Sequence, residues 1–286
     1  QIPGTTWCDI RSYASHVLAV QSDNTLWAWG NNTNGHLGQS DRVHRSSPVQ
    51  IPGTTWRKVA VGCCFSLGLK TDNTLWSWGS NFDGEMGIND LTHLAHSSPV
   101  QIPGASWCKM ASGVDSHFAI RTDGSLWAWG AGNLYGGNGL NNTDLVSSPT
   151  QLPGTWIDIT VTDGGGLGIQ SDNTLWAWGN NAQGHLAQSD IVHRSSPVQI
   201  PGTTWCKVAG AERAIAALKT DGTLWTWGAN FAGQLGVNNR ANKSSPTQVP
   251  GTTWCNVDMG PDRMIAQRTD NSLWMAGTNV NIDDLS

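Results

Sequence analysis

The most constraining feature of this 286-residue chain is the motif Leu-Trp-x-Trp-Gly, which returns at a nearly constant spacing. Successive copies lie 49, 51, 49, 49 and 49 residues apart, with a degraded sixth copy, Leu-Trp-Met-Ala-Gly. Two further markers, Gln-(Ile/Leu/Val)-Pro-Gly and Ser-Ser-Pro, keep the same phase, although Ser-Ser-Pro has no sixth copy. Three markers in one phase establish an internal repeat. Its six units begin near residues 1, 50, 101, 151, 199 and 248.

Each repeat has the pattern of β-structure. Thr-Leu-Trp-Ala-Trp alternates small or polar residues with large apolar ones, which is the period of a strand with one buried face. Asp-Asn or Asp-Gly precedes it, and these pairs suit tight hairpin turns. Two more apolar runs lie upstream, so each repeat is predicted to hold three strands, with a fourth at Ser-Pro-Val-Gln-Ile. The only glutamates are Glu85 and Glu212, too few for a helical protein.

Repeats of this length with three or four strands and a periodic Trp/Gly motif indicate a β-propeller. We therefore expect an all-β fold, a closed six-bladed β-propeller of about 49-residue repeats that forms a single domain over residues 1–286. A solenoid is disfavoured because no repeat resembles a polar cap. Residues 278–286 are expected to meet residues 1–7 within one blade.

The repeat resembles that of the regulator of chromosome condensation family. The best match is Thr-Asp-Gly-Thr-Leu-Trp-Thr-Trp-Gly-Ala-Asn-Phe-Ala-Gly-Gln-Leu-Gly at Thr220–Gly236. The resemblance covers essentially the whole chain and implies a propeller, usually of seven blades, so six is a departure. The family includes a nuclear exchange factor for a small GTPase, secreted β-lactamase inhibitors and a plant ultraviolet photoreceptor. Because its motif residues are mostly structural, the resemblance leaves the function open.

The sequence also has a longer repeat period, which spans three of the shorter repeats. Val20–Trp56 and Ile169–Trp205 match at 32 of 37 positions at a constant offset of 149. The chain is therefore interpreted as a duplicated three-repeat block. In a ring of six blades this would place repeats one and four opposite each other.

Tryptophan is unusually abundant, and all seventeen residues fall in three positions of the repeat. These three positions recur in all six repeats, and the one vacancy is Ala276. We interpret the indoles as packing between blades rather than as a sugar-stacking or light-sensing cluster.

Charge and motifs exclude several classes of function. The formal net charge is −5, and no run of Lys and Arg occurs, so neither nucleic acid nor an anionic membrane is expected as a partner. No stretch of 18 apolar residues occurs, so no membrane insertion is expected. The chain lacks a Gly-x-Ser-x-Gly elbow, a phosphate-binding glycine loop and His-Glu-x-x-His. We expect no enzymatic activity and no cofactor.

Two kinds of metal-ligating residue have a structural interpretation as well. His93-Leu-Ala-His96 has a spacing that binds metals on a helix, but no third ligand is evident, so no metal site is predicted. The cysteines that follow a first-strand Trp are predicted to be small buried thiols, with at most one disulfide in the chain. They are Cys8, Cys108, Cys206 and Cys255, beside an adjacent pair, Cys63 and Cys64.

Variation between repeats concentrates in the loops from Trp-Gly to Ser-Ser-Pro. A rigid scaffold that displays variable loops is typical of a recognition protein. We therefore expect a non-catalytic module that binds a protein partner through one face, and its low charge with abundant Asn, Thr, Ser and Gly favours an extracellular or cell-surface location. The candidate binding residues in the loops are His36, His44, Arg45, Phe82, Tyr135, His185, His193, Arg194 and Phe231.

Two alternatives remain open from the sequence. A lectin would have up to two equivalent glycan sites on repeats one and four, around His36 and His44 and around His185 and His193. A structural subunit of a surface fibre or appendage would instead pack the edges of its blades on neighbours. The ligand and the oligomeric state stay open.

Overall fold

Each repeat folds into one antiparallel β-sheet. The computed structural model describes residues 6–278, except residues 14, 115, 133 and 134, and every regular element in that part of the chain is a strand. The strands form six sheets, of which five have four strands and the last has three. The predicted fourth strand at Ser-Ser-Pro is therefore confirmed in the five repeats that contain this marker.

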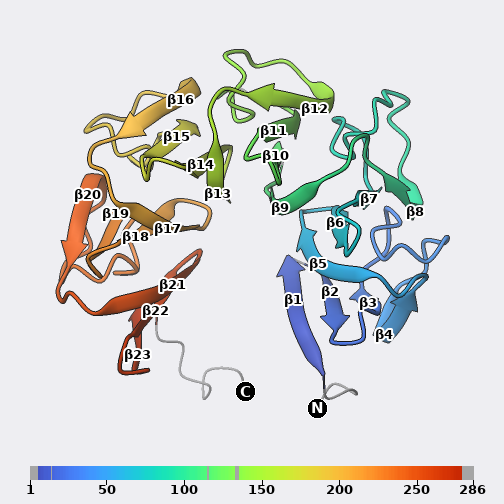
Figure 1. Cartoon of the computed structure of the whole chain (residues 1–286), viewed down its shortest axis with the longest axis horizontal. Helices are drawn as coiled ribbons and strands as arrows, with labels where there is room; N and C mark the ends of the chain where they lie inside the picture. The colour runs from blue at the N-terminus through green and yellow to red at the C-terminus, as the bar shows by residue number, and fades with distance from the viewer. Residues whose placement is uncertain (1–5, 14, 115, 133–134, 279–286) are drawn as a thin grey trace. The chain divides into compact units, whose positions relative to one another are not determined.

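The chain forms two compact halves, residues 1–155 and 156–286, which are described separately. Their boundary lies close to the predicted start of the fourth repeat near residue 151. The sheets of the first half contain β1 (Trp7–Tyr13), β2 (His16–Gln21), β3 (Leu26–Gly30) and β4 (Arg45–Ile51); β5 (Trp56–Val61), β6 (Phe65–Lys70), β7 (Leu75–Gly79) and β8 (His96–Gln101); and β9 (Trp107–Ser112), β10 (Ser116–Arg121), β11 (Leu126–Gly130) and β12 (Val146–Leu152) (Figure 1).

The second half has the same order of strands until its last sheet. Its sheets contain β13 (Trp156–Thr162), β14 (Gly165–Gln170), β15 (Leu175–Gly179) and β16 (Arg194–Ile200); β17 (Trp205–Gly210), β18 (Ala214–Lys219), β19 (Leu224–Gly228) and β20 (Lys243–Val249); and β21 (Trp254–Gly260), β22 (Arg263–Arg268) and β23 (Leu273–Gly277).

The core of each half lies between successive sheets. One buried cluster joins Leu26 and Ile51 of the first sheet to Trp56 and Trp78 of the second. Burial of large aromatic side chains between sheets is a main source of stability for such a fold. In the first and third Trp positions of the repeat, eight indoles are less than 2% exposed: Trp56, Trp78, Trp107, Trp129, Trp156, Trp178, Trp205 and Trp227. These side chains confirm the structural interpretation of tryptophan.

Three indoles of the third position also tie their sheets to the preceding repeat. The Nε1–H of Trp78 donates to the carbonyl of His36 at 2.9 Å, and Trp129 donates to Glu85 at 2.8 Å. In the second half, Trp227 donates to the carbonyl of His185 at 2.9 Å. A buried hydrogen bond thus fixes a loop of one repeat on the core of the next.

The predicted Asp-Asn hairpin turns are confirmed and have a further role. In the first repeat Asn24 has a φ of 64°, and Asp23 Oδ1 accepts from both the N–H and the hydroxyl of Thr25, at 3.0 and 2.7 Å. The hydroxyl of Thr25 in turn accepts from Trp27 Nε1 at 2.9 Å. These bonds hold the pKa of Asp23 below its usual range and orient the indole.

The prediction of buried thiols after the first-strand Trp is wrong. Cys8, Cys206 and Cys255 are exposed, and Cys108 is half-buried. The physical reason is a β-bulge at this position, as the shift of register between Trp7 and Asp9 shows for Cys8. The bulged residue leaves the regular alternation of the strand, so its side chain does not follow the buried face.

The last sheet lacks a fourth strand in the described part of the chain. The predicted meeting of residues 278–286 with residues 1–7 falls almost entirely on residues outside the described ones. Closure of the ring and the single-domain organisation therefore stay predictions.

Candidate recognition surface

The variable loops connect the third strand of each sheet to the fourth. They comprise residues 31–44, 80–95 and 131–145 in the first half and residues 180–193 and 229–242 in the second. Four of these loops fold around one buried side chain, which we call the central asparagine. The central asparagines are Asn32, Asn81, Asn181 and Asn230, each at most 1% exposed.

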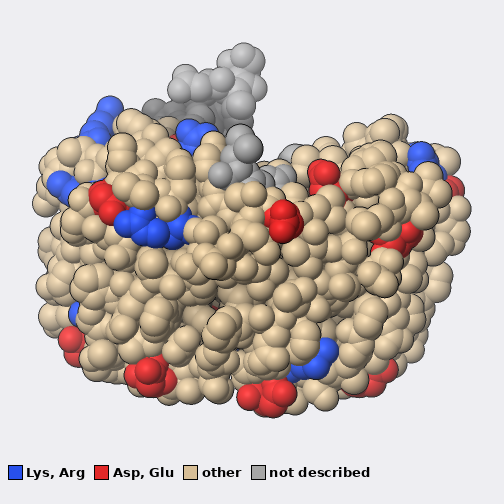
Figure 2. Space-filling view, turned by 90° about the horizontal axis from the view of Figure 1, so that it is seen from above, with Lys and Arg blue, Asp and Glu red and all other residues tan. Residues whose placement is uncertain are grey.

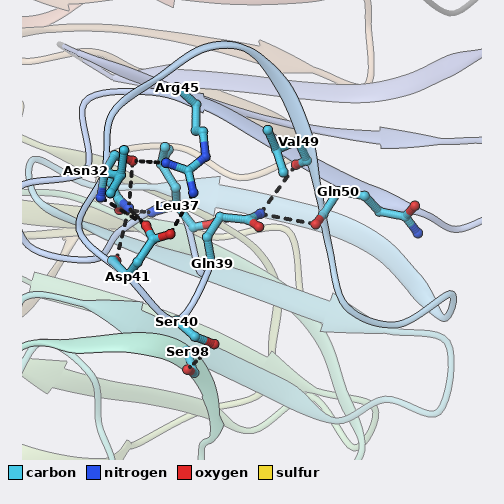
Figure 3. A network of polar contacts seen from close by, with 10 residues as sticks. Asn32, Leu37, Gln39, Ser40, Asp41, Arg45, Val49, Gln50 and Ser98 are labelled. Carbon is cyan, nitrogen blue, oxygen red and sulfur yellow. Dashed lines mark hydrogen bonds and ion pairs between the residues drawn. The ribbon is translucent and has the colours of Figure 1, made fainter.

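Asn32 shows how the central asparagine orders its loop (Figure 3). Its Nδ2 donates to the carbonyls of Asp41 and Val43, at 3.0 and 3.2 Å, and to Asp41 Oδ1 at 3.1 Å. Its Oδ1 accepts from the N–H of Leu37 at 2.9 Å. One side chain therefore closes a loop that has no regular structure of its own, by satisfying backbone groups from both of its arms.

The candidate residues His44 and Arg45 belong to the same network. His44 Nδ1 accepts from the backbone N–H of Asn32 at 2.9 Å, although the rest of the ring is exposed. Arg45 donates to the carbonyl of Val43 at 2.8 Å and to Asp41 Oδ2 at 2.6 Å. Its guanidinium thus stabilises the loop from within, and part of its hydrogen-bonding capacity is already used.

The fourth repeat has the same hydrogen bonds at equivalent residues. Asn181 Nδ2 donates to the carbonyls of Asp190 and Val192, both at 3.1 Å, and its backbone N–H donates to His193 Nδ1 at 2.9 Å. Arg194 donates to Asp190 Oδ2 at 2.7 Å. The retained His-Arg pairs therefore have a structural explanation, since they hold two loops in the same conformation.

Two other candidates are not available for direct contact. His36 is 2% exposed and His185 is fully buried, because both imidazoles lie beneath their loops against the adjoining sheets. The hydrogen bonds of Asn32 and Asn181 hold the flanking backbone over these two imidazoles. The two histidines on which the lectin alternative depends are therefore not accessible to a glycan. A protein that binds the loops does not contact them either.

The aromatic candidates have the expected exposure. Phe82 is 52% exposed and Phe231 is 63% exposed, at equivalent positions of the second and fifth loops, while Tyr135 is half-buried. Further exposed apolar side chains lie in the same loops and were not among the predicted binding residues. They are Val43, Leu91, Leu94 and Leu145 in the first half and Ile191 and Val192 in the second. Apolar residues within otherwise polar loops were the signal that could have found them.

Neighbouring loops within a half are linked through the sheets between them. The N–H of Ser40 donates to the carbonyl of Ser97 on β8 at 2.7 Å, and Ser40 Oγ lies 3.0 Å from Ser98 Oγ (Figure 3). Asn89 donates in the same way to Ser147 on β12 at 2.7 Å. The first and second loops thus rest on the fourth strand of the next sheet, so the loops of the first half form a connected surface.

The surface carries little charge. In Figure 2, basic and acidic side chains occur singly or in small groups separated by uncharged surface. Across the described residues, no group of three or more His, Cys, Asp or Glu side chains is placed to hold a metal ion. His93 Nδ1 instead contacts the carbonyl of Phe82 at 2.5 Å, and His96 Nε2 lies 3.3 Å from Asp90 Oδ2. Nor does that part of the chain have an apolar helix of membrane-spanning length.

Two family models match segments of the chain, and both describe the regulator of chromosome condensation (RCC1) repeat. One matches residues 23–69 and 221–260, and the other matches residues 7–35 and 56–85. Residues 7–85 and 221–260 are thus similar to RCC1 repeats. The resemblance expected from the sequence is therefore confirmed. No curated protein matches the sequence.

Solved structures of several other proteins have a similar fold. Human WBSCR16 is similar with a TM-score of 0.80 at 22% identity, over 92% of this chain and 72% of that one. Yeast RCC1 (Prp20), solved with Kap60, has a TM-score of 0.76 at 21% identity, over 94% and 70%. The ectodomain of the Arabidopsis thaliana receptor kinase ACR4 has a TM-score of 0.58 at 14% identity, over 96% and 80%. The likeness concerns the fold, and it confirms the all-β propeller class with six blades.

The RCC1-like repeats of the first half also bury a serine beside a histidine. His16 Nε2 lies 3.2 Å from Ser66 Oγ, and the hydroxyl of Ser66 donates to the carbonyl of His36 at 2.8 Å. Because the serine proton is used in that bond, His16 is the donor to Ser66. Both side chains are at most 1% exposed. The pair therefore packs the core and does not have the arrangement of a nucleophile activated by a base.

Replacing a central asparagine tests the order of the recognition loops. Asn181→Asp keeps the size of the side chain but places a carboxylate oxygen against the carbonyls of Asp190 and Val192. We expect the free energy of unfolding to fall by about 2 kcal/mol, since buried donors are lost and a charge is buried. Hydrogen exchange of residues 182–193 should become at least about tenfold faster.

The matched control is the adjacent Asn180→Asp. Asn180 Oδ1 accepts from the N–H of Ala182 at 2.9 Å, and a carboxylate can accept that bond equally well. Exchange in the loop should then stay at the wild-type rate. Equal effects of the two substitutions would contradict the role of the central asparagine.

Buried histidines make the stability of the protein depend on pH. Burial lowers the pKa of His117 to about 3, burial and the nearby His36 lower the pKa of His16 to about 3, and burial lowers that of His185 to about 4. An unfolded histidine has a pKa of about 6.5. The unfolded chain therefore binds more protons between these values, so the stabilisation is complete above about pH 6.5 and is lost as the pH falls toward about 4.

Urea unfolding between pH 7.5 and 5 measures this dependence, because the turn carboxylates titrate below that range. We expect His185→Gln to reduce the slope of the unfolding free energy by about 1.4 kcal/mol per pH unit. A slope that is unchanged in the variant would show that His185 is not held neutral by burial.

Proposed function

We propose that the chain is a non-catalytic recognition module that binds a protein partner through its third-to-fourth-strand loops. The observation that carries the proposal is that these loops combine an ordered backbone with exposed apolar side chains. Leu94 is 64% exposed, Ile191 is 66% exposed and Phe231 is 63% exposed, in loops whose backbone is fixed by a buried asparagine. Apolar side chains on a pre-ordered backbone bind without a large loss of conformational entropy.

The character of the exposed side chains favours a protein as the partner. Val43, Leu91 and Val192 are aliphatic, and side chains of this kind suit the apolar centre of a protein interface. A glycan site would need exposed aromatic faces beside polar groups, whereas most indoles of the chain are in the core. Protein partners are also known for similar propellers: yeast RCC1 was solved bound to Kap60, and another structure of Prp20p is described with its binding to Gsp1p and histones.

The proposal includes an extracellular or cell-surface location. Only 13% of the residues are charged, and the loops are rich in Asn, Ser, Thr and Gly. This composition keeps a surface hydrated without strong long-range electrostatics. Detection of the native protein in the culture medium or on intact cells would support this location, and its confinement inside the cells would exclude it.

A photo-crosslinking amino acid at position 94 or 231 tests the binding surface directly in the native surroundings. The matched control places the same group at position 10, where Ile10 is 47% exposed on β1 and lies outside the loops. We expect one protein to be captured from the loop positions and not from the control position.

The captured protein is then purified and its Kd is measured. Phe82→Ser with Leu94→Ser, or Ile191→Ser with Phe231→Ser, should weaken binding at least about tenfold, a cost of about 1.4 kcal/mol. Ile157→Ser, at a residue 41% exposed on β13, should leave the affinity unchanged. Equal affinity of all the variants would refute a binding site on the loops.

A further inference from the structure

The turn between β5 and β6 contains two adjacent cysteines, Cys63 and Cys64, which neither the repeat nor the proposed function explains. Both residues are half-buried, so a small reagent reaches them from solvent. Their Sγ atoms lie 3.3 Å apart. The turn therefore brings two thiols together at the surface of the first half of the chain.

The conformation of this turn does not require cysteine. The equivalent turn of the fifth repeat has Glu212 and Arg213 in place of Cys63 and Cys64. In both turns the residue before the pair donates its N–H to the carbonyl of the residue after it, at 3.0 Å. Because a Glu-Arg pair makes the same turn, what distinguishes the second repeat is the chemistry of the two side chains.

The backbone that carries the two thiols is held on both sides. A Cβ on Gly62 would overlap the ring of Phe65 and lie 2.9 Å from the carbonyl oxygen of Gly113 in the next sheet, so the turn packs closely there. On the other side the carbonyl of Cys64 accepts from the N–H of Ser80 at 2.9 Å. Two donors on a fixed backbone bind one ligand without a large loss of conformational entropy.

The distance between the sulfurs favours a shared ligand over a disulfide. A disulfide needs the two sulfurs at about 2.0 Å, and between adjacent cysteines it closes a small ring that contains their peptide bond. That ring would move the carbonyl of Cys64 away from Ser80. By contrast, one atom bonded to both sulfurs at about 2.3 Å spans the observed 3.3 Å with an angle of about 90° at that atom. Such an atom binds without a change of the turn.

The angle and the number of donors indicate the class of this atom. Structural zinc takes four ligands in a tetrahedron, and in the described part of the chain no third His, Cys, Asp or Glu is placed to complete a metal site with the two thiols. A trivalent metalloid of the arsenic group is pyramidal, with angles close to a right angle, and brings its own third substituent. Such a centre is soft, and thiolates are the ligands that soft centres prefer.

We propose that Cys63 and Cys64 form a bidentate site for one trivalent thiophilic metalloid, of the class of the monosubstituted arsenicals. When the oxide of such an arsenical binds, two arsenic–sulfur bonds form and the arsenic–oxygen bond breaks. The oxygen leaves as water with the two thiol protons, and the arsenic stays trivalent. The proposal does not depend on the proposed recognition function, although Ser80 begins the second recognition loop.

The cysteines that follow the first-strand Trp serve as an internal reference. Each donates its thiol hydrogen to a carbonyl of the paired strand, at sulfur–oxygen distances of 3.3 to 3.5 Å, and each lies on a different sheet: Cys8, Cys108, Cys206 and Cys255. A single thiol makes one bond to arsenic, and an excess of a monothiol displaces it. Two linked donors bind about 10²–10⁴-fold more tightly than one.

Phenylarsine oxide is the probe, added to the reduced full-length chain in an excess of 2-mercaptoethanol and followed by native mass spectrometry. We expect one phenylarsenic adduct per monomer. Cys63→Ser and Cys64→Ser should each bind the probe at least about hundredfold more weakly, because only one sulfur remains. Cys206→Ser is the matched control and should keep the affinity of the wild type.

A double variant, Cys63→Glu with Cys64→Arg, separates the loss of the two sulfurs from a loss of the fold. It has the turn residues of the fifth repeat, so we expect a folded chain that forms no adduct. The amide of Ser80 gives a second readout by NMR, since it donates to the carbonyl of Cys64. Its resonance should shift when the wild type binds the probe and stay unchanged when the probe is added to the double variant.

Three results would overturn the proposal. The first is a wild-type adduct that the monothiol removes as readily as it removes the adduct of a single thiol. The second is wild-type affinity in Cys63→Ser or Cys64→Ser. The third is an adduct whose mass shows that the arsenic joins two chains, because the two sulfurs of one turn would then not bind it together.

Discussion

The order of this molecule depends on a hydrogen bond from a buried indole to a loop of the preceding repeat. Trp78, Trp129 and Trp227 each pack in the core and donate to a carbonyl of the loop before them. A carbonyl buried without this donor would cost about 1–3 kcal/mol, so the bond and the packing stabilise each other. Burial of one large side chain therefore holds together two sheets and the loop between them.

The central asparagine extends this order to the tip of the loop. Asn32 and Asn181 satisfy backbone groups on both arms of their loops, and an arginine bound to Asp41 or Asp190 closes the outer turn. The polar groups of the loop are thereby directed inward, and aliphatic side chains such as Val43 and Ile191 remain outside. The same repeat that packs the core therefore also presents ordered loops with exposed aliphatic side chains, which suit recognition.

The sequence predicts the scaffold well because its signals are local and repeated six times. Asp-Asn turns, alternating Trp residues and Pro-Gly breaks act within one hairpin, so spacing alone places the strands. The exposure of Cys8 could not be predicted from spacing, because a β-bulge interrupts the alternation of buried and exposed residues in the strand. His36 and His185 occur in loops that appear exposed from their composition, and only the path of the backbone around the central asparagine puts these imidazoles in the core.

Hydrogen exchange of the wild-type chain tests most directly the claim that the recognition loops are as ordered as the sheets. The decisive amides are those of Leu37 and Leu186, which lie in loops and donate to the central asparagines at 2.9 Å. We predict that both amides exchange as slowly as the amides within the adjoining strands. Exchange of these amides at the rate of an unstructured chain, with the strands still protected, would contradict it.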